Sequence, residues 1–348
     1  MQKEKKSSRI LYLDILRIIA IFFVLYIHTG QRGKLHYQIA GMSASYYISM
    51  TLFCMAQICN MLFLMISGAL LLNREENLQK TMKRFGRMAL VVILFSIFQF
   101  YCTYLQIPEM GFDVLLCLKI MYHSPIITQY WYLYIYLGFL LLLPILRILA
   151  KHMEVKHYFY LFGLFILEDG ILPVIERLWD NDSLNIDIPI STMIIIFPLL
   201  GHFLAHKTEE LWQNKRNLII LNVLAVVSLI ISVVEANIAY TVDGNTEYVL
   251  QGFIFFIVAA IFVDIKVFCE HFTLPKWVQK TFTFAGNGVF GVYLLERQIK
   301  DNLVFVYDYL EPYTTWVVAV FVWLVVSILV GVVITNILKL IPGVKKLI

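Results

Sequence analysis

The chain has 348 residues, of which 60% are hydrophobic, 15% aromatic and 15% charged. A soluble domain carries roughly 25% charged and 45–50% apolar residues, so this composition, with a mean hydropathy of +0.77, excludes an ordinary soluble enzyme and predicts an all-α membrane protein. The net charge is +4, but the basic residues lie mostly between apolar stretches, where they orient membrane helices. Nucleic acid is therefore not an expected partner.

The apolar stretches predict about ten membrane-spanning helices, because about 20 apolar residues are needed to cross a bilayer as a helix. The first stretch, 10–29, follows a basic start but is too long for a signal peptide and contains Asp14 and Arg17, so it should remain as a helix. The others are 46–72, 88–106, 130–149, 158–175, 190–206, 218–239, 249–265, 284–300 and 315–338. Residues 1–348 are thus expected to form a single membrane domain with no separate soluble domain.

The basic residues also predict the orientation of the chain. If the helices alternate from a cytoplasmic N-terminus, 21 basic residues fall in inner segments and four in outer ones, namely Arg32, Lys34, Lys119 and Arg177. Because positive charge is retained on the cytoplasmic side, both termini are expected there. Residues 108–129 form a long connection with its own apolar piece, which we expect to lie in the membrane interface or to re-enter the membrane.

Three ionisable residues in the first predicted helix are functional candidates, because such groups are costly at membrane depth unless they are paired or hydrated. Arg17 and His28 differ by about 20° around the helix and by about 16 Å along it. They therefore share one face, with Arg17 in the cytoplasmic third and His28 near the outer boundary. The alternative is that Asp14 and Arg17 form an ion pair near the headgroups and that His28 is an interfacial histidine.

Two further places carry ionisable residues in apolar stretches. In the ninth predicted helix, a polar face is formed by Tyr293, Glu296, Arg297 and Lys300, in which Glu296 and Lys300 are the best-placed local ion pair. This face could also neutralise itself at the membrane surface. In the fifth, at least one of the neighbouring carboxyl groups of Glu168 and Asp169 should be protonated or face a basic partner, unless that helix ends early and both are hydrated.

Several short motifs resemble those of the acyltransferase family 3 of integral membrane O-acyltransferases. Residues 9–20, RILYLDILRIIA, leading to His28, are similar to its first-helix signature of an arginine, ten residues and a histidine. Residues 84–87, RFGR, are similar to its Arg-x-x-Arg pair before the third helix. Further similar stretches are MISGALL at 65–71, QYWYL at 129–133, GHFL at 201–204 and GVYLL at 291–295. In this order the motifs extend the resemblance over essentially the whole chain.

The resemblance implies an O-acetyltransferase that moves an acyl group, in particular acetyl, from cytoplasmic acetyl-CoA as co-substrate to a hydroxyl of a cell-surface glycan or lipid-linked saccharide. Such a transfer needs a base for the hydroxyl proton, a role for which imidazole is the usual choice, and arginines for the donor phosphates. The catalytic candidates are His28, Glu296 and Asp14, and the donor-binding candidates are Arg17, Arg84 and Arg87.

Many members of that family have a histidine where this chain has Glu296, and a carboxylate there can orient or charge-pair with an imidazole. The alternatives from other classes are a proton-coupled transporter or flippase of a glycan lipid, and a catalytically inactive membrane sensor. We disfavour the transporter because the two halves show no internal repeat. The cysteines lack metal-ligand spacing, so no metal is expected, and the expected location is the bacterial plasma membrane, among its lipids.

Overall fold

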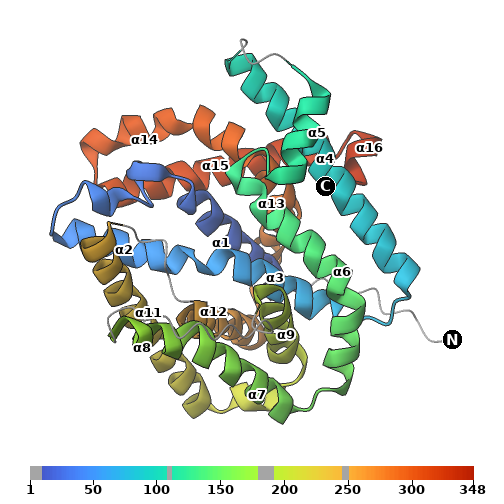
Figure 1. Ribbon diagram of the computed structural model, residues 1–348, viewed down its shortest axis with the longest axis vertical. Coiled ribbons are helices and arrows are strands. Elements are labelled where there is room, and N and C mark those ends of the chain that lie inside the picture. The colour runs from blue at the N-terminus through green and yellow to red at the C-terminus, as the bar shows by residue number, and fades with distance from the viewer. Residues whose placement is uncertain (1–9, 108–111, 179–191, 245–250) are drawn as a thin grey trace.

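The computed structural model describes residues 10–107, 112–178, 192–244 and 251–348, and every regular element in these ranges is a helix (Figure 1). The α-helices are α1 (Leu11–Ile27), α2 (Ala44–Ala56), α3 (Ile58–Leu71), α4 (Leu78–Gln106), α5 (Val114–His123), α6 (Trp131–His152), α7 (Val155–Ile166), α8 (Leu172–Leu178), α9 (Met193–His206), α10 (Glu209–Gln213), α11 (Lys215–Asp243), α12 (Gln251–His271), α13 (Lys276–Asn302), α14 (Val304–Leu310), α15 (Trp316–Leu338) and α16 (Pro342–Lys345). Short 3-10 turns occur at Gly30–Arg32, His36–Gln38, Thr128–Tyr130 and Glu311–Tyr313, and a π-helical turn, η5, at Leu167–Ile171.

Seven of the described segments are long and apolar enough to cross a membrane, namely α2 with α3, α4, α6, α7 continuing toward α8, α11, α12 and α15. Helix α9 is apolar but shorter. Helices α1 and α13 carry the ionisable residues that the sequence analysis singled out. All of these elements overlap the ranges predicted from the sequence, and the chain is an all-α polytopic membrane protein.

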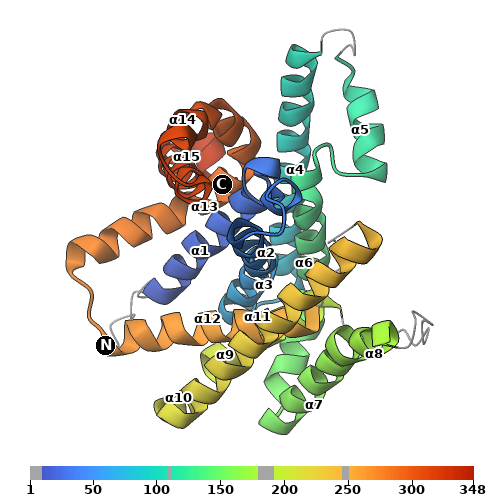
Figure 2. The ribbon, with the colours of Figure 1, turned by 90° about the vertical axis from the view of Figure 1, so that its left-hand side faces the viewer.

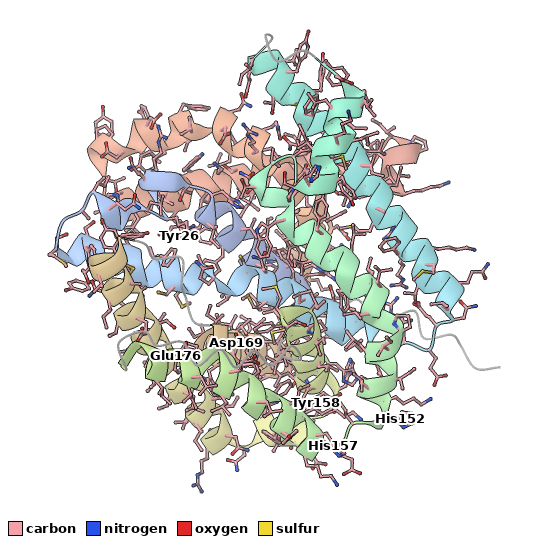
Figure 3. All side chains as sticks on the ribbon, viewed as in Figure 1. Tyr26, His152, His157, Tyr158, Asp169 and Glu176 are labelled. Atoms are coloured by element: carbon pink, nitrogen blue, oxygen red, sulfur yellow. The ribbon has the colours of Figure 1, made fainter. Side chains whose placement is uncertain are left out.

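Several helix ends that were predicted to share a side of the membrane lie at the same end of the bundle. In Figure 1, α14 and the start of α2 lie on the left, and α16 lies on the right. Figure 3, in the same view, places Tyr26 and Glu176 toward the left and His152 and His157 toward the right. We call the left side the outer end and the right side the inner end, which the basic residues predict to be cytoplasmic.

This orientation predicts a clear difference in chemical labelling. In a variant without the five native cysteines, a Glu311→Cys substitution at the outer end should react with a membrane-impermeant maleimide in intact cells. A Lys83→Cys substitution at the inner end should react only after the cells are opened. Both positions are exposed, so accessibility within the fold does not limit the reaction. Labelling of Lys83→Cys in intact cells would contradict the orientation.

Helices α1 and α3 lie near the centre of the bundle, as the view from the outer end shows (Figure 2). Helix α3 packs against α9 with the two backbones in contact, because a Cβ atom at Gly68 would overlap the carbonyl of Pro198 and one at Gly201 would overlap that of Met65. Small residues allow such close approach between membrane helices. The Ser-Gly and Gly-His motifs therefore include the residues that hold α3 against α9.

The structure interrupts one predicted helix and adds detail to two other segments. The helix predicted over 46–72 is interrupted at Gln57, which separates α2 from α3 and lines a cavity described below. In the long connection, α5 is an apolar helix of 10 residues, too short to cross a bilayer. The fifth predicted helix does not end at Glu168 and Asp169, because the chain continues through η5 into α8.

Candidate active site

A cavity of about 380 Å³ at the inner end lies between α1, α3, α4, α6 and α13, and we call it the inner cavity. Three arginines line it, Arg17 from α1 and Arg84 and Arg87 from α4. Much of the remaining wall is apolar or aromatic and includes Phe63, Leu70, Tyr132, Tyr136, Phe290 and Tyr293. The fold thus brings together the three residues that were predicted to bind the donor.

Carboxylates already orient two of these three guanidinium groups. Nη1 of Arg17 lies 2.5 Å from Oδ1 of the fully buried Asp14, so the ion pair considered above is present, and Arg17 lines the cavity as well. Nη2 of Arg84 lies 2.7 Å from Oε1 of Glu76. Within the described ranges, Arg87 has no carboxylate at ion-pair distance. Its guanidinium is the one most available to an anionic ligand.

Glu76 and Arg147 were not among the predicted site residues, although they support this cavity. Arg147, buried near the end of α6, donates from Nη2 to Oε2 of Glu76 at 2.8 Å, from Nε to the carbonyl of Leu71 at 3.0 Å and from Nη1 to the hydroxyl of Thr81 at 3.1 Å. One side chain therefore joins the ends of α3, α4 and α6. The sequence does not indicate which of the neighbouring Glu75 and Glu76 is buried. In the structure the side chain of Glu76 is 6% exposed and that of Glu75 is 89% exposed.

The charge of Glu76 follows from these contacts. Burial alone would raise the pKa of this carboxyl group, but the hydrogen bond from Arg147 and the charges of Arg84, Arg147 and Lys80 outweigh that effect. The pKa of Glu76 therefore lies below its usual range. An ionised, fixed carboxylate thus holds Arg84 at the wall of the inner cavity.

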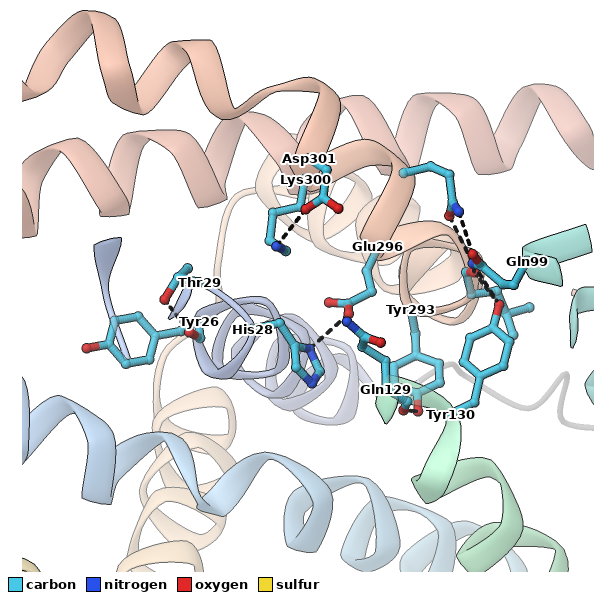
Figure 4. A network of polar contacts seen from close by, with 12 residues as sticks. Tyr26, His28, Thr29, Gln99, Gln129, Tyr130, Tyr293, Glu296, Lys300 and Asp301 are labelled. Carbon is cyan, nitrogen blue, oxygen red and sulfur yellow. Dashed lines mark hydrogen bonds and ion pairs between the residues drawn. The ribbon is translucent and has the colours of Figure 1, made fainter. Parts of the chain in front are cut away.

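A second cavity, of about 650 Å³, lies at the outer end, and we call it the outer cavity. His28 lines it together with amide, aromatic and basic side chains, among them Lys34, Gln57, Asn60, Gln129, Trp131 and Tyr293. Figure 4 shows His28 facing Glu296 of α13, with Nδ1 of the ring 2.9 Å from Oε1 of the carboxylate. The distance is that of an ion pair, although the atoms are not aligned for a hydrogen bond.

The pairing of Glu296 with Lys300, which the sequence analysis favoured, is wrong. Nζ of Lys300 instead lies 2.9 Å from Oδ1 of Asp301 and 5.6 Å from the centre of the Trp323 ring of α15. Residues four apart on a helix differ in direction by about 40°, so the two side chains can turn toward different neighbouring helices. Glu296, whose side chain is 0% exposed, faces His28 at the end of α1.

Hydrogen bonds fix the segment of α13 that carries Glu296. The hydroxyl of Tyr130 donates to the carbonyl of Leu294 at 2.7 Å. On α4, Nε2 of Gln99 donates to Oε1 of Gln298 at 2.9 Å. The hydroxyl of Tyr293 donates to the carbonyl of Gln129, just before α6 (Figure 4). These contacts hold α13 against α4 and the start of α6, so Glu296 lies on a rigid part of the bundle.

The two cavities approach each other at Tyr293, which lines both of them. The boundary is narrow on the other helices too. On α3, Asn60 lines the outer cavity and Phe63 lines the inner one. On α6, Trp131 lines the outer cavity and its neighbour Tyr132 lines the inner one. The two cavities therefore open toward opposite ends of the bundle, and Tyr293 belongs to the layer of side chains between them.

Comparison with known families decides the class of this site. A family model described as an acyltransferase domain (acyltransferase 3) matches residues 10–336, nearly the whole chain. The chain belongs to this family. It is therefore a membrane acyltransferase. Comparison with curated proteins and with solved structures gave no significant match.

The acyltransferase fold groups the predicted site residues into two sets. His28 and Glu296 meet at the outer cavity, whereas Asp14 lies beside Arg17 near the inner one. Asp14 is thus placed to orient an arginine, and it lies far from His28 along α1. Glu168 belongs to η5, which packs against α12, and lines neither cavity. Among the residues that the structure describes, no three His, Cys, Asp or Glu side chains converge as metal ligands would.

Proposed function

We propose that this acyltransferase transfers an acetyl group from cytoplasmic acetyl-CoA to a hydroxyl of a cell-surface glycan on the other side of the bacterial plasma membrane. The observation that carries the proposal is the pair of cavities that meet at Tyr293. An enzyme that takes an acyl group from one side of a membrane and delivers it to the other needs two entrances and one meeting point. The inner entrance carries arginines, and the outer one carries a histidine.

The inner cavity suits a thioester donor with phosphates. Arg84 and Arg87 line it from α4, and guanidinium groups bind phosphate with paired, charge-assisted hydrogen bonds. Beyond them the wall is largely apolar and aromatic up to Tyr293, which fits a pantetheine arm. On this proposal the phosphates stay at the arginines, the arm passes Arg17, and the thioester carbon reaches Tyr293.

The contact between His28 and Glu296 supports general base catalysis. Since Nδ1 of His28 faces Glu296, Nε2 takes the proton of the acceptor hydroxyl as its oxygen attacks the thioester carbonyl. The new ester C–O bond forms, the C–S bond breaks, and the leaving CoA thiolate takes the proton from the imidazolium. Glu296 orients the ring and stabilises the imidazolium. Within the described ranges Oε2 of Glu296 has no hydrogen-bond partner, and a buried carboxylate in that state is costly, which favours a role in function.

The outer cavity has the chemistry of a saccharide site. Amide groups from Gln57, Asn60 and Gln129 can donate to and accept from sugar hydroxyls, and the ring of Trp131 offers an apolar face. A glycan or a lipid-linked saccharide would place one hydroxyl at His28. The acceptor then stays at the outer end throughout the reaction, and only the acetyl group passes the layer at Tyr293.

A binding measurement tests the donor side of the proposal. In purified protein, replacing both Arg84 and Arg87 with alanine should weaken acetyl-CoA binding by about tenfold or more, because hydrogen bonds to charged groups contribute roughly 1.5–3 kcal/mol each. Lysine at both positions should restore the affinity only in part, since it lacks the two-pronged guanidinium. The control is Lys83→Ala, which removes an exposed charge outside the cavity. Unchanged donor affinity in the double alanine variant would contradict the proposal.

A further inference from the structure

A third cavity, of about 780 Å³, lies at the inner end, and we call it the side cavity. It is formed by the ends of α6 and α9 and by the segment that joins α3 to α4. Its lining is polar and includes Arg74, Arg147, Lys151, His206, Lys207 and Glu209. His152, which also lines it, is labelled at the inner end in Figure 3. Nothing in the proposed reaction has yet used this space.

Four arginine or lysine side chains and three glutamates line the side cavity, so its small net positive charge favours an anion. Two of its cations are already paired, Arg147 with Glu76 at 2.8 Å and Lys151 with Glu75 at 3.2 Å. Arg74 lies 4.0 Å from Glu76, the outer limit of an ion pair, and its side chain is 49% exposed. Among the described residues, Lys207 has no carboxylate at ion-pair distance. Arg74 and Lys207 are therefore the cations that a ligand can recruit.

The size of the inner cavity shows why a donor needs more room. Pockets that enclose a drug-sized ligand measure roughly 300–1,000 Å³, and the inner cavity, at about 380 Å³, is near the lower end of that range. An acyl-CoA is considerably larger than such a ligand, because it joins a pantetheine arm to a phosphorylated nucleoside. The inner cavity can hold the arm, but the nucleoside must lie elsewhere.

The side cavity adjoins the inner one. At the end of α3, Leu71 lines the inner cavity and the next residue, Leu72, lines the side cavity. On α6, Leu140 lines the inner cavity and Pro144, one turn further on, lines the side cavity. Glu76 bridges the two, because one carboxylate oxygen contacts Arg84 and the other contacts Arg147. A ligand that leaves the inner cavity past Arg84 therefore meets the side cavity next.

We propose that the side cavity binds the 3′-phosphorylated adenosine of the acyl-CoA donor, with Arg74 and Lys207 contacting its 3′-phosphate. The proposal rests on the proposed function, since it assigns the far end of the same donor. On this assignment the diphosphate lies at Arg84 and Arg87, and the donor bends around the end of α3. The side cavity then sets the selectivity for a donor that carries a 3′-phosphate.

The test compares CoA with 3′-dephospho-CoA as ligands of the purified full-length protein. The wild type should bind CoA about tenfold or more tightly than 3′-dephospho-CoA, because the two differ only in the group that Arg74 and Lys207 contact. In the Arg74→Ala/Lys207→Ala variant this preference should fall to near one. The affinity for 3′-dephospho-CoA itself should change little.

The matched control is Lys83→Ala/Lys156→Ala. It also removes two exposed cations of the inner end, but these two residues line none of the three cavities. It should keep the wild-type preference. Three results would overturn the side-cavity assignment while leaving the donor itself in place. The wild type could bind CoA and 3′-dephospho-CoA equally well, the preference for CoA could survive in Arg74→Ala/Lys207→Ala, or the control variant could lose that preference to the same extent. If the wild type bound neither CoA nor its dephospho form, the proposed function would fall as well.

Discussion

Replacing His28 with alanine is expected to reduce the proposed acylation of the surface glycan by about 10²–10⁴-fold, the usual effect of removing a general acid or base. The imidazole, just beyond the end of α1, lines the outer cavity, and its contact with Glu296 fixes the ring against α13. The neighbouring carboxylate of Glu296 has no exposed surface, so we do not expect it to take the acceptor's proton in place of the imidazole. The variant should still insert and accumulate, because His28 follows α1 and is partly exposed.

The measurement is the O-acetyl signal in NMR spectra of isolated surface glycan, compared at equal protein levels. His36→Ala is the control, because His36 lies at the same end and stacks on Trp316 with ring centres 4.1 Å apart, but does not line the outer cavity. Glu296→Gln should reduce acylation less than His28→Ala, since it removes the charge that supports the ring but keeps the base. A His28→Ala protein at normal levels with unchanged acylation would exclude the mechanism.

An Arg147→Met substitution is expected to reduce the free energy of unfolding by about 3–5 kcal/mol, the cost of removing one partner from a buried ion pair. It would remove one of the two guanidinium groups that contact the buried Glu76 and would also break the contacts to Leu71 and Thr81. Lys151→Met is the control, because Lys151 pairs with Glu75 and both are exposed. An exposed pair of that kind contributes about 0–1 kcal/mol.

Unfolding of the detergent-solubilised protein, followed at several pH values, measures this effect. The pKa of Glu76 is lowered in the folded protein, so its contribution to stability is present above the usual glutamate pKa of about 4.3 and is lost as the pH falls through the lowered value. The difference in the free energy of unfolding between wild type and Arg147→Met should therefore persist at neutral pH and become smaller in acid. Adding Glu76→Gln to Arg147→Met should recover part of the loss. Equal destabilisation by Lys151→Met would contradict this account.

Much of the fold follows from the sequence alone. Apolar stretches near 20 residues must be helical in a bilayer, because lipid offers backbone groups no hydrogen-bond partners, and the described spanning helices overlap those stretches. The periodicity of α1 also placed Arg17 and His28 at opposite ends of one face, and they line the inner and outer cavities respectively. These features depend on local geometry and on the solvent, so one sequence is enough to predict them.

The pairing of charges was decided by the tertiary structure. Spacing along one helix favoured an ion pair between Glu296 and Lys300. The packing of α13 against α1 and α15 instead places Glu296 against His28 and Lys300 beside Trp323. In the same way, Glu76 and Arg147 are 71 positions apart and meet only because α3, α4 and α6 end at one place. The energy of a buried charge depends on every helix that surrounds it. The sequence therefore determined which residues this acyltransferase keeps in the membrane, and the arrangement of helices determined which of them act together.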